Sequence, residues 1–295
     1  MSWRVTLPCT RAQAEALPEA DELFAHAADP PVLVADEPDP AKPDDWLLHA
    51  YFEHEPSTDD LARLTLLGSG APATESLAET DWVSMSQAGL QPLRAGRFYV
   101  HTPTHRGTVP AGAIAFEIDA GLAFGTGQHA TTAGCLEALD LLEQNGCKFT
   151  NIADIGTGTG LLAFAALALW PTAKCIATDI DSVAVDVARD NAAINGVALG
   201  HGAGELLLAV ADGMDSPLLA ARAKFDLLIA NILAGPLIEF APAFTAALPP
   251  GGTIILAGLL DSQAEAVMSA YTELGLAVTA RGHGEWPVLV LVTPA

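Results

Sequence analysis

Residues 151–169, NIADIGTGTGLLAFAALAL, constrain the fold more than any other part of the chain. They begin with the apolar pattern of a buried strand and end in an apolar run of helical length. Between the two, Gly156, Gly158 and Gly160 allow a tight turn and a close approach of the backbone to other groups. A strand, a glycine turn and a helix in this order predict a ligand site, because such a turn presents free N–H groups at the start of the helix.

Strand and helix patterns alternate along the carboxy-terminal two thirds of the chain. We expect strands at residues 114–118, 152–155, 175–178, 205–210, 225–230, 254–256 and 288–292. We expect helices at residues 131–144, 161–169, 182–195, 237–246 and 262–274. Repeated βα units predict an α/β fold with a mostly parallel sheet of seven strands and helices on both faces. The last strand has no helix before it that is long enough for a crossover, so we expect it to be antiparallel.

The amino-terminal part has a different pattern. Trp3, Val5 and Leu7 alternate with polar residues as in a half-buried strand, and STDDLARLTLL begins with helix-capping residues. With a helix after Thr10 and further strands near residues 32–34 and 47–52, these patterns predict a small α+β domain. We therefore expect three parts: a small domain over residues 1–75, a linker over 76–112 and the main domain over 113–295. We interpret the small domain as a substrate-recognition module, with a stabilising appendage as the alternative.

Two acidic residues follow the strands expected at residues 175–178 and 205–210. Asp179 lies in the segment ATDID at residues 177–181, where a carboxylate can accept both hydroxyls of a bound ribose, and its neighbour Ile180 belongs to the same expected site. NAD enzymes and methyltransferases both use such an acid, so Asp179 indicates a nucleoside ligand but does not distinguish these two classes of enzyme. Asp212 lies where an adenine edge is expected, although Asp-Gly is also a common turn.

Asn231 follows the next strand, in the segment ANILAGPL. Ligands of open parallel sheets bind beyond the carboxyl ends of the strands, so Asn231 and the glycine turn are expected to face the same crevice. The amide oxygen of Asn231 can accept a hydrogen bond from an amine and orient its lone pair. The alternative is an asparagine that stabilises its own turn.

A second glycine-rich segment, GLAFGTGQHATT at residues 121–132, precedes the first strand of this crevice. Gly125 and Gly127 would allow the segment to close over a ligand. Thr131 or Thr132 would cap the following helix and contact the ligand. His129 is interpreted as structural, because a single histidine near a helix start more often is.

Composition limits the partners and the compartment. Asp and Glu outnumber Lys and Arg by 36 to 13, and a net charge of −23 argues against nucleic-acid binding. It favours a basic partner, or only keeps the protein in solution. The cysteines, Cys9, Cys135, Cys147 and Cys175, are too scattered for a metal site or a disulfide framework. We therefore expect no bound metal. Because no signal-peptide pattern or membrane-spanning run is evident, we expect a cytoplasmic protein.

Several segments in order make the chain similar to a known family. They are EIDAGLAFGTGQHATT, DIGTGTGLLA, ATDID, ARDNAAINGV and ANILAGPL, then PGG, LAGLLDSQAEAV and GEWPVLVLV. With them the chain resembles the ribosomal protein L11 methyltransferases, the PrmA family. The resemblance implies a class I methyltransferase (Rossmann-like) fold, a ferredoxin-like recognition domain and S-adenosylmethionine as the methyl donor. It also implies trimethylation of the α-amino group and lysine side chains of that ribosomal protein.

The resemblance also assigns residues. It implies cofactor contacts at Thr132, Gly156 and Asp179, with Asn231 at the methyl-transfer end as the catalytic residue. The complete expected cofactor site is Thr132, Gly156, Gly158, Gly160, Asp179, Ile180, Asp212 and Asn231. Two departures fall in the glycine-rich segment, where the family has Asp-Pro-Gly and Thr-His-Pro. The chain has Asp119-Ala120-Gly121 and Gln128-His129-Ala130 instead.

Three alternatives stay open. An NAD-dependent oxidoreductase is disfavoured because Leu161 occupies the place of the third fingerprint glycine. A non-catalytic cofactor-binding module is disfavoured by the intact Asn231 segment. A methyltransferase acting on another protein or on a small amine keeps the same chemistry. We expect the protein to be a monomer, because no spare apolar helix face is evident.

Overall fold

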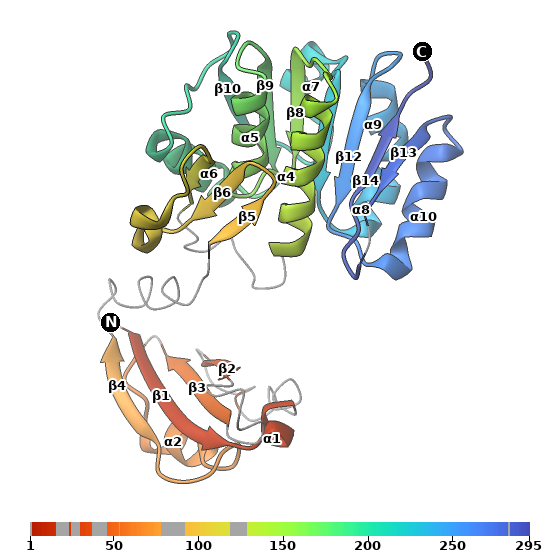
Figure 1. Cartoon of the computed structure of the whole chain (residues 1–295). Helices are drawn as coiled ribbons and strands as arrows, with labels where there is room; N and C mark the ends of the chain where they lie inside the picture. The colour runs from red at the N-terminus through yellow and green to blue at the C-terminus, as the bar shows by residue number, and fades with distance from the viewer. Residues whose placement is uncertain are drawn as a thin grey trace. The chain divides into compact units, whose positions relative to one another are not determined.

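The computed structural model describes residues 2–15, 24, 30–36, 46–52, 54–77, 92–118, 129–282 and 284–295 (Figure 1). The chain forms two compact units, Met1–Gly89 and Leu90–Ala295. The division falls inside the segment 76–112 that the sequence suggests as a linker. In the part of the chain that the model describes, no helix is long and apolar enough to cross a membrane.

The first unit is built on an antiparallel sheet with the strand order β2-β3-β1-β4. Its elements are β1 (Ser2–Cys9), α1 (Arg11–Glu15), β2 (Val32–Asp36), β3 (Trp46–Phe52), α2 (Thr58–Leu64) and β4 (Ala73–Leu77). The order βαββαβ with β1 and β3 in the centre is the split βαβ arrangement of ferredoxin-like domains. The expected small α+β domain is thus confirmed in its fold. Strand β4, ATESL, is not predicted from the sequence because it lacks an apolar alternation.

Alternating residues of the central strands form the core of this unit. Val5, Leu7, Ala50 and Phe52 have 3% or less of their surface exposed and lie in one cluster with Leu64 of α2. Ser57 begins α2: its hydroxyl accepts from the Asp60 N–H, and the Asp60 carboxylate accepts from the Ser57 N–H. This reciprocal capping is the reason that the helix begins where the sequence predicts it.

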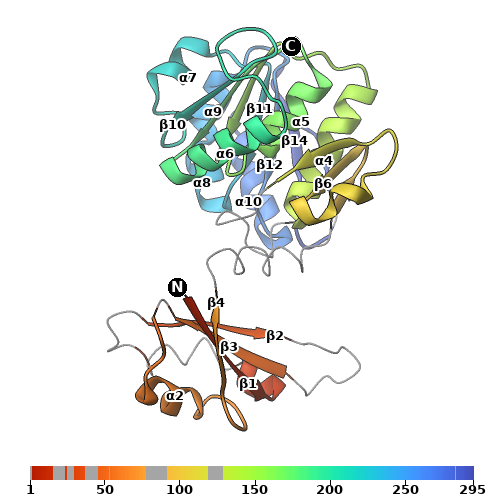
Figure 2. The same cartoon turned by 90° about the vertical axis from the view of Figure 1, so that its left-hand side faces the viewer.

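The second unit contains a sheet of seven strands in the order β10-β9-β8-β11-β12-β14-β13 (Figures 1 and 2). The strands are β8 (Asn151–Ile155), β9 (Lys174–Asp179), β10 (Leu206–Val210), β11 (Leu227–Asn231), β12 (Thr253–Ala257), β13 (Ala277–Arg281) and β14 (Leu289–Val292). The first five strands of the order are parallel, and β14 pairs antiparallel with both β12 and β13. The mostly parallel sheet and its antiparallel last strand are confirmed.

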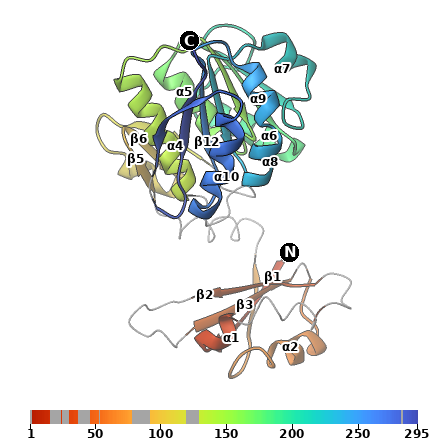
Figure 3. The same cartoon turned by 90° about the vertical axis from the view of Figure 1, so that its right-hand side faces the viewer.

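Helices cover both faces of this sheet. They are α4 (His129–Gln144), α5 (Leu161–Leu169), α6 (Ser182–Ile194), α7 (Pro217–Arg222), α8 (Ala234–Glu239), α9 (Ala241–Ala247) and α10 (Asp261–Thr272). Figure 3 shows α4 and α5 on one side of the sheet and α8, α9 and α10 on the other. Two separate apolar clusters match these layers, because one contains residues of α4 to α6 and the other residues of α7 to α10.

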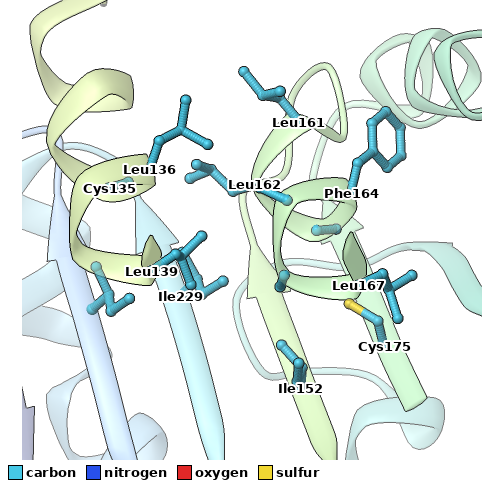
Figure 4. Packing of buried hydrophobic residues seen from close by; sticks show 14 of the residues in the cluster. Cys135, Leu136, Leu139, Ile152, Leu161, Leu162, Phe164, Leu167, Cys175 and Ile229 are labelled. Carbon is cyan, nitrogen blue, oxygen red and sulfur yellow. The ribbon is translucent and has the colours of Figure 1, made fainter. Parts of the chain in front are cut away.

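The packing of α4 and α5 against the sheet positions the glycine turn (Figure 4). Leu136 and Leu139 of α4 are fully buried, and Phe164 of α5 is 1% exposed. Cys135 and Cys175 lie in the same cluster, and burial raises the pKa of both thiols. The four cysteines are free thiols. A well-packed layer under α5 keeps the start of this helix fixed, as a ligand site requires.

One expected strand lies elsewhere. Residues 114–118 were expected in the main sheet, but β7 (Ile114–Glu117) pairs with β6 (Phe98–His101), which pairs with β5 (Leu93–Ala95) in a separate sheet of three strands. That prediction was wrong, because an apolar run indicates a strand but not its partner. The seventh strand of the main sheet is instead β13, AVTAR, whose residues are all exposed. Its lack of a buried face explains why no periodic pattern predicts it.

Candidate active site

The glycine turn joins β8 to α5 at the carboxyl edge of the parallel strands. Gly156 has φ +74° and Gly160 has φ +85°, a region that favours glycine. Gly160 is also the N-cap of α5 and has no side chain that could cap the helix. In the first turn, the Ala163 N–H interacts with the Asp154 carboxylate. The N–H groups before Ala163 and the positive end of the helix dipole are therefore the part of α5 suited to bind a ligand.

Packing leaves no room for side chains at two of these glycines. A Cβ at Gly156 would lie 2.2 Å from Cγ2 of Ile232, and one at Gly160 would lie 2.5 Å from Cζ of Phe164. A Cβ at Gly158 would have nothing within 4 Å. Gly158 therefore borders the open side of the turn, where a ligand can approach the backbone.

Asp179 ends β9, the parallel neighbour of β8, and is bound to the glycine turn. Its Oδ2 accepts from the Gly158 N–H at 2.9 Å, and its Oδ1 accepts from the Asp181 N–H at 3.1 Å. The cap of α6 is Asp181, whose Oδ1 accepts from the Val183 N–H at 2.8 Å. Asp179 is thus fixed but is not a helix cap, and each carboxylate oxygen keeps a lone pair for a ligand hydroxyl.

Ile180 and Asp212 lie beside Asp179. Ile180 is 68% exposed and offers an apolar surface on which a flat ring can stack. The Ala211 N–H donates to the Asp179 carbonyl at 2.9 Å. The next residue, the exposed Asp212, therefore also lies near Asp179. The Asp212 carbonyl accepts from the Asp215 N–H at 2.9 Å, so the alternative interpretation of a turn also applies to Asp212.

Asn231 is the last residue of β11, between β8 and β12 in the sheet. It pairs in register with Ala257, and its side chain is half-buried. The next residue, Ile232, is held from two sides. Its Cγ2 meets Gly156, and its carbonyl oxygen would lie 2.3 Å from a Cβ at Gly258, which has φ +86°. The carboxyl ends of β8, β11 and β12 therefore converge around Asn231.

Thr132 lies in the first turn of α4 and is 5% exposed. Within the described residues no hydrogen bond joins its side chain to the glycine turn, so its contact with a ligand stays a prediction. The expected closing segment, including Gly125 and Gly127, lies outside the described residues. His129 begins α4. In the described part of the chain no cluster of three or more His, Cys, Asp and Glu side chains is arranged to hold a metal ion.

Asp154 of β8 is a buried acidic residue that the sequence patterns do not predict as part of the site. Its side chain is fully buried; Oδ2 accepts from the Thr157 hydroxyl at 2.6 Å, and Oδ1 has no hydrogen-bond partner among the described residues. Burial, the largest cause, and the nearby charge of Asp179 together raise the pKa of Asp154 to about 7, although hydrogen bonds from Thr157 and from the Ala163 N–H lower it. An aspartate between the buried apolar residues of the strand segment IADI is the signal that would have identified it.

The raised pKa of Asp154 predicts how stability depends on pH. The ordinary pKa is 3.8 and the folded one about 7, so the folded state favours the protonated acid, and stability falls as the pH rises through this window. The Asp154→Asn variant lacks this titration. Between pH 5 and pH 8 the free energy of unfolding of the wild type should fall relative to the variant by roughly 3 kcal/mol. Urea unfolding of both proteins measures the difference; parallel curves across this range would contradict it.

The sheet and the site together define a class of protein. In the sheet, the antiparallel strand β14 lies between β12 and β13. The glycine turn follows the central strand β8, and the acidic residue Asp179 ends the neighbouring strand β9. These are the features of the methyltransferase fold. A solved structure agrees: the chain is similar to the ribosomal protein L11 methylase from Lactobacillus delbrueckii subsp. bulgaricus, with a TM-score of 0.57 and 27% identity, over 70% of this chain and 100% of that one.

Sequence comparisons give the particular family. The family model described as Ribosomal protein L11 methyltransferase (PrmA) matches residues 13–293. The chain is 50% identical over 211 residues, 72% of each chain, to the ribosomal protein L11 methyltransferase of Brucella suis (strain ATCC 23445 / NCTC 10510). It is 44% identical over 236 residues, 78% of each chain, to that of Agrobacterium fabrum (strain C58 / ATCC 33970). The chain belongs to the ribosomal protein L11 methyltransferase (PrmA) family.

Proposed function

We propose that this protein transfers methyl groups from S-adenosylmethionine to the α-amino group and lysine side chains of ribosomal protein L11. One observation carries the proposal: the glycine turn, Asp179 and Asn231 meet at one edge of the sheet in a chain of this family. The names of the relatives support the acceptor. The reaction would occur in the cytoplasm, with the enzyme acting as a monomer.

The described residues fit S-adenosylmethionine. Asp179 would accept hydrogen bonds from the ribose hydroxyls, and the open backbone at Gly158 and the first N–H groups of α5 would hold the methionine part. Ile180 and Asp212 would border the adenine. Gly160 completes the turn, and Thr132 would contact the ligand from α4. NAD fits less well, because Leu161 is buried at the position where a dinucleotide turn needs its third glycine.

Positioning would supply most of the catalysis. S-adenosylmethionine provides an activated methyl group on its sulfonium, so the protein needs to hold a neutral amine in line with it. The pKa of a free lysine is about 10.4 and that of an α-amine about 8, and loss of water around the amine in the crevice lowers both. The Asn231 amide oxygen would accept a hydrogen bond from the amine and direct its lone pair. The proton would leave to water.

Asn231→Ala tests this role directly. We expect kcat for L11 methylation to fall about a hundredfold, because misplacing a reacting group typically costs that much. The dissociation constant for S-adenosylmethionine should change less than threefold, since Asp179 and the glycine turn remain. Mass spectrometry of the methylated acceptor and calorimetric titration of the cofactor give the two values. Full turnover by the variant would remove Asn231 from the mechanism.

We also propose that the first unit recognises the acceptor. On its edge strand β2, Val32 is 64% exposed and Val34 43% exposed, on the side of the sheet away from the buried core. Their neighbours across the strand pair are Tyr51 and His49, both half-buried. Apolar side chains that stand out from an exposed strand indicate a protein-binding surface more than a mere stabilising role.

A further inference from the structure

A groove of about 870 Å³ lies between α4 and the β13–β14 hairpin, and its described lining includes no residue of the glycine turn. Val288, Val290 and Val292 of β14 form its floor, and α4 forms a wall that includes Ala138 and Leu141. Leu141 is 53% exposed. The volume is within the range of about 300–1,000 Å³ that is typical of ligand sites.

One end of the groove lies at the edge of the sheet that carries Asn231. At Gly134, shortly after Thr132, α4 approaches β14 so closely that a Cβ would lie 2.5 Å from Cγ2 of Val288. On the hairpin side, the Asp261 N–H donates to the carbonyl of Glu285, which lines the groove, at 2.9 Å. Asp261 begins α10, just beyond the carboxyl end of β12. A chain bound in the groove would therefore lead toward the methyl-transfer edge.

The charged side chains that line the groove are mainly acidic. Glu137 and Glu285 line it and are exposed, and neither forms an ion pair with another described residue. Arg281 also lines it, but its guanidinium is 2.7 Å from Asp261 and 3.5 Å from Glu265. These two carboxylates offset its charge. The groove thus combines an apolar floor with a negative rim.

We propose that this groove binds a segment of the methyl acceptor that carries both cationic and apolar side chains, so that a neighbouring amine reaches Asn231. The inference rests on the proposed function and extends it to how the acceptor is held. Charge complementarity selects this occupant. A second copy of the chain is disfavoured, because two proteins of net charge −23 repel each other and would meet at a negative rim.

Charge reversal tests the rim. The double variant Glu137→Lys/Glu285→Lys should raise KM for the L11 acceptor about tenfold, with kcat and the dissociation constant for S-adenosylmethionine within twofold of the wild type. The matched control, Asp190→Lys/Glu273→Lys, makes the same change in net charge at two exposed residues of α6 and the end of α10. Equal KM values for the two double variants would overturn the proposal.

A photo-crosslinker tests the occupant. With p-benzoylphenylalanine at position 141, we expect crosslinks to L11; at position 194, where Ile194 is similarly exposed on α6, we expect none. Crosslinks between two copies of the enzyme at 141, or equal yields at both positions, would overturn the proposal. Absence of methylation by the wild type would instead reject the proposed function, so the two failures are distinguishable.

Discussion

Replacing Asp179 with alanine is expected to weaken the binding of S-adenosylmethionine a hundredfold or more. The carboxylate is held by the Gly158 and Asp181 N–H groups, so it reaches the ribose hydroxyls without further ordering. Two hydrogen bonds to a charged acceptor are each worth about 1.5–3 kcal/mol. Isothermal titration of the cofactor measures the loss, while kcat at saturating cofactor should change much less.

The neighbouring residue Asp181 provides a matched control. Asp181→Ala removes the cap of α6, in which Oδ1 accepts from the Val183 N–H, at a cost of about 1 kcal/mol in stability. Its affinity for S-adenosylmethionine should stay within threefold of the wild type. If Asp181→Ala loses the cofactor and Asp179→Ala keeps it, the ribose-binding role assigned to Asp179 is wrong.

Gly156→Ala is the second change with a large expected effect. The positive φ of Gly156 costs about 1–2 kcal/mol for a residue with a Cβ, and the overlap with Cγ2 of Ile232 adds about 1–3 kcal/mol. The free energy of unfolding should therefore fall by about 3 kcal/mol. Cofactor affinity should fall too, because the turn must move away from Ile232. Urea unfolding and cofactor titration measure the two effects.

Two further variants separate strain from overlap. Gly158→Ala has a positive φ of 54° but open space around the new Cβ, so it should show the backbone cost alone. The double variant Gly156→Ala/Ile232→Ala removes the overlap and should destabilise less than the two single changes summed. If Gly156→Ala is no more damaging than Gly158→Ala, the contact with Ile232 does not constrain the turn.

Local patterns were enough to predict the centre of the fold. Helix α5 has the bounds that the run 161–169 predicts, and its C-cap is Trp170, the residue before Pro171, because a proline disfavours helical backbone in the residue that precedes it. Strands β8, β9 and β11 are each a short apolar run next to a turn. Because parallel strands place their carboxyl ends together, the convergence of the glycine turn, Asp179 and Asn231 also followed from the sequence.

Features that depend on tertiary packing were not predictable. Strand β13 has no buried residue and so no pattern, while β7 has a strand pattern that does not reveal its partner β6. The raised pKa of Asp154 arises from complete burial, which a single polar letter in NIADI does not show. The groove beside α4 depends on how the β13–β14 hairpin is placed, which the sequence left open.

The most direct test of the proposed activity is mass spectrometry of purified ribosomal protein L11 after incubation with this enzyme and S-adenosylmethionine. We predict mass gains in steps of one methyl group, mapped to the amino terminus and to lysine side chains, and none with Asp179→Ala at low cofactor concentration. An unchanged mass, with cofactor binding confirmed in the same sample, would contradict the proposed acceptor and point to another protein or a small amine.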